Sequence, residues 1–193
     1  MEYIEVKKEQ YEVIERLNSY LLKVKKDDQD YMLYDFNGKH ERFLDFKFAY
    51  KRLKVTGILI PKLLVLDKKC DRALVEYLSG PTAFDLLIEK DLDEKIIEQV
   101  FNINYRARIN QLRLDFDPRK FIYHNDKLYY TAFTFSQYYR EEDFTQKEIR
   151  LWFYTNEFKN LLIEKGIAID KGRLKNEYER NKEIVLTVVK FFK

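Results

Sequence analysis

The N-terminal stretch of the chain alternates between apolar and polar side chains, which is the period-two pattern of β-strands. Leu22 and Val24, for example, alternate with Lys23 and Lys25. A polar turn follows these residues, and a short aromatic run comes after the turn. We therefore expect residues 3–36 to form an antiparallel meander, in which consecutive strands are joined by tight turns.

Later segments change to the three- and four-residue spacing of apolar side chains that is typical of amphipathic helices. This spacing predicts helices over about residues 40–55, 93–111, 146–165 and 175–192. Gly57 and Gly166 are expected to end the first and third of these helices. Between the first two, residues 73–80 predict a buried strand and a turn, and Thr82 with Asp85 is expected to cap a short helix. The pattern as a whole predicts an α+β fold.

The helix faces can be predicted in more detail. The first helix is expected to bury one apolar stripe, made of Phe43, Phe46, Ala49, Tyr50 and Leu53. The second should be buried on two sides, because it carries two apolar rows: Ile96, Val100, Ile103 and Ala107, and Ile97, Phe101, Tyr105 and Ile109. The last helix is expected to carry an apolar side made of Val185, Val188 and Phe192.

Composition limits the function classes only loosely. The chain has 193 residues, of which 46% are hydrophobic and 36% charged, so it can form one domain or two small lobes that share a cleft. Lys and Arg exceed Asp and Glu by 36 to 33, which permits an anionic ligand without requiring nucleic acid. The one cysteine, Cys70, excludes an intrachain disulfide. We find no secretory signal and no apolar run near the ~20 residues that span a bilayer, so we expect a cytoplasmic protein that does not enter the membrane.

The candidate chemistry lies in one loop and the hairpin that follows it. Arg113, Asp115, Pro118 and Lys120 match the spacing of the protein-kinase catalytic loop, H-R-D-x-x-P-x-N. In that loop Asp orients the substrate hydroxyl and Asn binds magnesium. Here Arg113 takes the place of His and Lys120 that of Asn. Thr131, 11 residues after Lys120, stands where the metal-binding Asp of D-F-G is expected.

In the order and spacing of these motifs the chain resembles the protein-kinase-like superfamily, in particular its small atypical branch of RIO-type and lipopolysaccharide-kinase-like proteins, as a degenerate member. The resemblance implies a two-lobed protein-kinase-like fold. Residues 1–78 are expected to form an N-terminal lobe with an antiparallel sheet and one helix. Residues 79–193 are expected to form a reduced, mostly helical C-terminal lobe that carries the degenerate catalytic loop.

The resemblance also implies a set of nucleotide-binding positions, most of which are substituted. Glu76 and Leu78 stand where the kinase hinge meets the adenine edge. Tyr34 stands where a strand lysine would pair with the phosphates, while Lys120 and Thr131 replace the two metal ligands. The first-hairpin turn that corresponds to the glycine-rich loop contains no glycine. ATP is therefore the cofactor implied by the resemblance, but the loss of both metal ligands argues against magnesium and against ordinary phosphoryl transfer.

Asp115 has two interpretations. As the residue at the catalytic Asp position it would orient a substrate hydroxyl. As a structural residue it would accept hydrogen bonds from backbone N–H groups and order the loop, and this interpretation is the more common one for such a carboxylate. Lys120, with help from Arg119, would place an ammonium near the vacated metal position, where it can bind a nucleotide phosphate or an acidic side chain of a partner without metal.

Three functions remain open. The first is a pseudokinase-like binding or regulatory module with a protein partner. The second is an active atypical ATP-dependent kinase that uses Asp115 with displaced metal ligands such as Asp117 or Asp126. The third is a nucleic-acid-binding α+β domain that uses basic and aromatic side chains on an exposed sheet. His40 and His124, the only histidines, lie near predicted turns and are expected at the surface.

Overall fold

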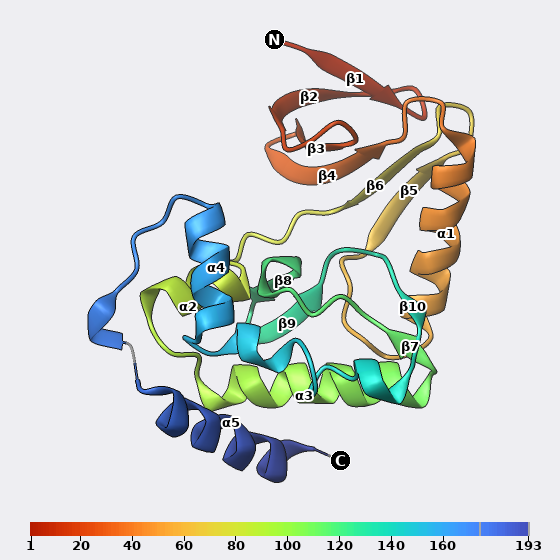
Figure 1. The fold of residues 1–193 in the computed structure, drawn as a ribbon. Coiled ribbons are helices and arrows are strands. Elements are labelled where there is room, and N and C mark those ends of the chain that lie inside the picture. Colours follow the sequence, from red (N-terminus) through yellow and green to blue (C-terminus); the bar gives the residue numbers. More distant parts are fainter. Residues whose placement is uncertain (174, 193) are drawn as a thin grey trace. The chain divides into compact units, whose positions relative to one another are not determined.

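The computed structural model describes residues 1–173 and 175–192. The α+β prediction is confirmed, because these residues form a six-stranded antiparallel sheet, two small two-stranded sheets and five α-helices (Figure 1). The chain divides into two compact units. The N-terminal unit comprises Met1–Val55 and Ile60–Ser79, and the C-terminal unit comprises Thr56–Leu59 and Gly80–Lys193. Within the described residues, no helix is long and apolar enough to cross a membrane.

The N-terminal unit is built on the six-stranded sheet, whose order is β1-β2-β3-β4-β6-β5. Every neighbouring pair is antiparallel, and the predicted meander is confirmed. Two of its hairpins turn through residue pairs with positive φ, Lys7–Lys8 and Asp27–Asp28, as the tightest hairpins require. The strands are β1 (Tyr3–Val6), β2 (Glu9–Arg16), β3 (Leu21–Lys26), β4 (Gln29–Asp35), β5 (Leu63–Asp67) and β6 (Arg72–Glu76).

Helix α1 (His40–Lys54) belongs to the same unit, and its predicted apolar stripe is confirmed. The buried residues of this helix are Phe43, Phe46, Ala49, Tyr50 and Leu53. Gly57, which lies just beyond the helix, has a φ of +74°, the left-handed conformation expected for a residue after a helix end. A separate apolar cluster on the sheet consists of Ile4, Val6, Tyr11, Leu22, Val24, Leu33 and Leu74.

The C-terminal unit is mostly helical, with short strands between α3 and α4. Thr82 and Asp85 form a complete capping box at the start of α2, as predicted. The larger elements are α2 (Ala83–Glu89), α3 (Glu94–Ile109), α4 (Asn156–Glu164) and α5 (Glu177–Phe191). The short strands are β7 (Leu112–Arg113), β8 (Phe121–His124), β9 (Lys127–Tyr130) and β10 (Ser136–Gln137). Four 3₁₀ turns complete it: η1 (Pro118–Lys120), η2 (Arg140–Glu142), η3 (Ile149–Trp152) and η4 (Lys171–Arg173).

The continuous helix predicted over residues 146–165 is wrong. The segment instead contains the 3₁₀ turn η3, an extended residue, Phe153 (φ −130°, ψ 157°), and then α4. Thr155 begins α4 because its hydroxyl accepts a hydrogen bond from the Phe158 N–H and donates one to the Arg150 carbonyl. A threonine that satisfies both groups favours a helix start over a continuing helix. Gly166 ends α4 with a φ of +67°, as predicted.

Two predicted helix faces also need correction. The first row of α3 is buried throughout, but in the second row Tyr105 and Ile109 are 38% and 57% exposed, so α3 is not buried on two sides along its whole length. On α5, Val185 and Phe192 are exposed and the buried apolar residue is Ile184. Ile184 lies outside the predicted apolar side, so spacing alone did not identify the most buried apolar residue of the helix.

Candidate functional site

The loop that carries Asp115 begins where α3 ends. Gln111 has a φ of 58°, and this left-handed residue turns the chain out of the helix into β7. β7 then pairs antiparallel with β10, which fixes the first part of the loop (Figure 1). The loop therefore leaves a strand that is hydrogen-bonded on one edge, and it reaches the 3₁₀ turn η1 after Asp117.

Asp115 has both a structural role and a charged partner. Its Oδ1 accepts a hydrogen bond from the Asp117 N–H at 3.1 Å, so the carboxylate orders the loop. Its Oδ2 forms an ion pair with the Lys120 ammonium. The two side chains are 48% and 37% exposed, so the pair is accessible to a ligand from solvent.

Thr131 joins this pair through the backbone. Its N–H and its hydroxyl both donate to the Lys120 carbonyl, at 2.9 Å and 3.0 Å. The structure thus brings Asp115, Lys120 and Thr131 together in the C-terminal unit, and we refer to these three residues as the loop cluster. Phe133, two residues beyond Thr131, has a φ of 50°, which is a conformation that favours glycine.

The backbone next to the loop cluster is bonded and packed by residues that were not predicted as part of the site. The Trp152 indole N–H donates to the Phe116 carbonyl at 2.8 Å, and both groups are buried. The Phe116 ring lies 4.7 Å from the Phe144 ring and 5.6 Å from the Phe121 ring. Phe121 in turn contacts Tyr130, whose pKa rises to about 12 because of burial. The exposed charged residues of the loop are therefore attached to backbone that packs against an aromatic core.

Asp117 and Arg119 interact mainly with each other. The Asp117 carboxylate caps η1 by accepting from the Arg119 N–H at 2.9 Å, and it also pairs with the Arg119 guanidinium. Burial would raise the pKa of Asp117, but the hydrogen bonds and charge of Arg119 outweigh burial and lower it. Asp126 accepts from the Tyr123 hydroxyl at 3.2 Å. No group of three or more His, Cys, Asp or Glu side chains that could hold a metal ion occurs in residues 1–173 and 175–192.

Arg113, at the position of the kinase His, is paired. Its Nη2 lies 2.7 Å from Glu148 Oε1, and its Nε donates to the Glu142 carbonyl at 3.2 Å. Burial raises the pKa of Glu148, although the charge of Arg113 acts in the opposite direction. Arg113 thus anchors β7 to the segment before α4, and its charge is balanced by carboxylates.

The remaining predicted positions belong to the N-terminal unit. The Tyr34 ring lies 4.9 Å from the Phe46 ring, and burial raises the pKa of the Tyr34 hydroxyl. Glu76 accepts from the Lys62 N–H at 2.8 Å through its side chain, and its own N–H donates to the Lys62 carbonyl. Leu78 is 5% exposed. Tyr34 therefore supplies an aromatic contact to α1 where the resemblance places a lysine.

Comparison with models of protein families gives no match for this chain, and comparison with curated proteins gives no significant match. The local geometry of the loop cluster is therefore the basis for a functional proposal.

Proposed function

We propose that the chain is a catalytically impaired, kinase-like domain that acts as a binding or regulatory module, and that its loop cluster binds an anionic group without a divalent cation. The observation that carries the proposal is the ion pair between Asp115 and Lys120, with Thr131 bonded to the Lys120 backbone. A positive side chain and a hydroxyl thus stand where the resemblance places an amide and a carboxylate.

The electrostatics of the loop cluster favour this proposal over an active enzyme. Magnesium in phosphoryl transfer is held by oxygen ligands, and it neutralises the charge that develops on the phosphate. The Lys120 ammonium already pairs with the one carboxylate of the loop cluster, so a divalent cation would have to displace it to gain that ligand. The same ammonium can form a charge-assisted hydrogen bond to a phosphate or carboxylate oxygen of a ligand.

The backbone around Thr131 gives further support to the resemblance. The resemblance places Thr131, Ala132 and Phe133 at the positions of the D-F-G triplet, whose third residue is glycine. Phe133 has a φ of 50°, although a bulky side chain disfavours that conformation.

A thermal-shift titration tests the anion site. ATP at about ten times its Kd should stabilise the protein by roughly 1.4 kcal/mol, or about 3–5 °C, in buffer that contains EDTA. Lys120→Met should abolish this shift. Lys127→Met, which removes an exposed lysine from the neighbouring hairpin, is the matched control and should retain it. A shift that appears only when magnesium is added would contradict the proposal.

An ATP-consumption assay separates the module from the enzyme. We expect no turnover above that of an Asp115→Ala variant, because the loop cluster provides no carboxylate pair for a metal. Turnover that depends on both magnesium and Asp115 would instead support the atypical kinase.

A further inference from the structure

Helix α5 carries apolar side chains on two opposite faces. Its inner face packs against the C-terminal unit through Ile184, which is 7% exposed, and through Phe191, whose ring lies 5.8 Å from the Phe101 ring. Its outer face is open to solvent. The large apolar residues there are Tyr178, Val185, Leu186 and Val189, which are 77%, 59%, 59% and 77% exposed.

These outer residues lie on one side of α5. At 3.6 residues per turn they fall within a stripe about 100° wide, with Val185, Leu186 and Val189 together and Tyr178 two turns before them. Single exposed apolar side chains are ordinary on a protein surface, but several on one side of a helix mark a candidate interaction surface. Lys182 also lies on the stripe, and its aliphatic stem can cover apolar neighbours while its ammonium stays in solvent.

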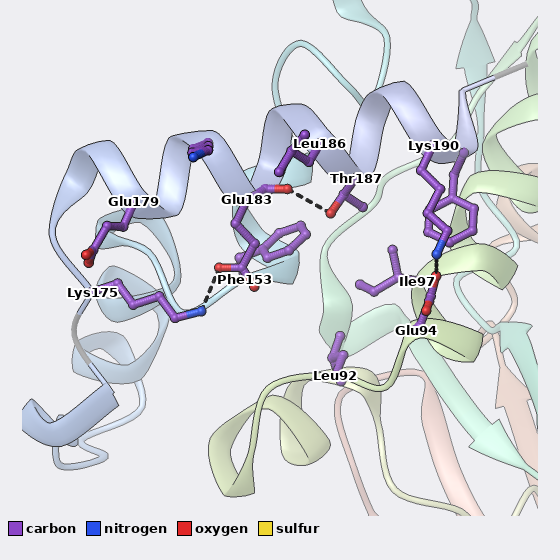
Figure 2. Close-up of a pocket in the computed structure, with 12 residues that line it drawn as sticks. Leu92, Glu94, Ile97, Phe153, Lys175, Glu179, Glu183, Leu186, Thr187 and Lys190 are labelled. Atoms are coloured by element: carbon purple, nitrogen blue, oxygen red, sulfur yellow. Dashed lines mark hydrogen bonds and ion pairs between the residues drawn. The ribbon is translucent and has the colours of Figure 1, made fainter.

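The charges beside the stripe indicate what covers it. Glu179 and Lys190 are 11 residues apart, which is about three helical turns, so they project from the same side of α5. Both line a groove of about 740 Å³ that runs beside the helix, with one near each end of it (Figure 2). Within the described part of the chain, Glu179 forms no ion pair. Lys190 pairs with Glu94, but both side chains are about 60% exposed, and such surface pairs exchange partners at little cost.

We propose that α5 is a self-association helix, on which a second copy of the chain docks through its own α5 in antiparallel orientation. In a two-fold symmetric pair, Glu179 of each copy lies opposite Lys190 of the other, so one contact produces two ion pairs. The midpoint between these residues falls beside Val185, which places the apolar stripe of each helix against that of the other. Tyr178 then lies near the C-terminal end of α5 of the second copy.

The sign of the charges selects this arrangement. In a parallel pair of α5 helices, Glu179 of one copy would lie about three helical turns from Lys190 of the other, so neither ion pair could form. In the antiparallel pair, the two apolar stripes meet and each Glu179 lies opposite the Lys190 of the other copy. Self-complementarity of this kind is what a second copy of the same chain requires, because both partners present the same surface.

Charge reversal tests the proposal, because each variant alone should dimerise more weakly whereas a mixture of the two variants should dimerise. The full chain should dimerise in sedimentation-velocity experiments over a concentration series. Glu179→Lys alone and Lys190→Glu alone should each weaken the dimer by roughly tenfold, because each places two like-charged pairs at the contact. An equimolar mixture of the two variants should form heterodimers, detected by native mass spectrometry, because both charge pairs are then opposite again.

Lys8→Glu and Glu15→Lys are the matched controls, since they make the same charge changes at exposed positions of the N-terminal unit. Each control should dimerise like the unaltered chain, and their mixture should show no preference for heterodimers. Circular dichroism verifies that every variant is folded. The proposal is overturned if the unaltered chain stays monomeric up to its solubility limit, if both α5 variants dimerise as well as the controls, or if their mixture gives no excess of heterodimer.

Discussion

Trp152 offers a quantitative test of how the loop cluster is supported. Its indole N–H donates to the Phe116 carbonyl, which lies in the backbone between Asp115 and Asp117. Replacing Trp152 with Phe removes this donor and part of the ring volume, but keeps an aromatic side chain in the core. The change therefore removes a backbone anchor of the loop while leaving every charged residue of the loop in place.

The expected cost has two parts. Phe116 is 2% exposed, so its carbonyl loses its partner away from solvent, which costs about 1–3 kcal/mol. The smaller ring leaves a void where Trp152 was 1% exposed, and this adds about 1 kcal/mol. The free energy of unfolding should thus fall by about 2–4 kcal/mol, a large share of the 5–15 kcal/mol that is typical of folded domains.

Urea denaturation followed by far-UV circular dichroism measures this loss. Fluorescence is unsuitable, because Trp152 is the only tryptophan of the chain. The control is Phe153→Leu, which reduces buried volume at the next position without removing a hydrogen-bond donor, and it should cost about 1 kcal/mol. If Trp152→Phe costs no more than Phe153→Leu, the indole bond does not anchor the loop and the reasoning fails.

Three further predictions concern the loop cluster and its surroundings. Thr131→Asp combined with Lys120→Asn should introduce the two metal ligands of the kinase motif that the chain resembles, so thermal shifts with ATP should become magnesium-dependent. The pKa of Asp117 in the folded protein lies below its free value of 3.8. Its contribution to stability is therefore present above about pH 3.8 and is lost as the pH falls further. Asp117→Asn should flatten this acid dependence in urea titrations. Gly80→Ala should cost about 2–3 kcal/mol in thermal or urea unfolding, because the added Cβ would lie 1.9 Å from the Tyr123 carbonyl oxygen.

Each of these predictions has its own control. Thr131→Asp alone, with Lys120 retained, should gain little magnesium dependence, because the ammonium still repels the cation. Glu98→Gln, an exposed carboxylate on α3, should leave the acid dependence unchanged. Gly166→Ala should cost only about 1 kcal/mol, since a Cβ there meets no atom within 4 Å and only the positive φ opposes it. A Gly80→Ala cost as small as that of Gly166→Ala would contradict the close backbone approach.

The sequence predicted the elements whose signals are local. The stripe of α1, the strands of the meander and the Thr82–Asp85 cap all follow from spacing within a few residues, and all are confirmed. The break before α4 was missed because it depends on Thr155 bonds and on the placement of Trp152. Apolar periodicity continues across the break, so the pattern gave no sign of it.

For the candidate site, spacing identified residues that lie together but not the residues that support them. Motif spacing selected Asp115, Lys120 and Thr131, which the structure brings together. The aromatic support beneath them was not predictable, because Trp152 lies 36 residues from Phe116 and only tertiary structure joins them. The pairing of Arg113 with Glu148 likewise depends on a contact over 35 residues.

The attachment of α5 has a consequence for its dynamics. Only Arg180 and Ile184 of this helix are buried, and Arg180 is bonded to Asp91 and Glu183. Because so few side chains of the helix are buried, its local opening should require less free energy than unfolding of the whole unit. Added salt should screen the exposed Lys190–Glu94 pair and speed amide hydrogen exchange in α5, while α3, with its fully buried row, should exchange at an unchanged rate.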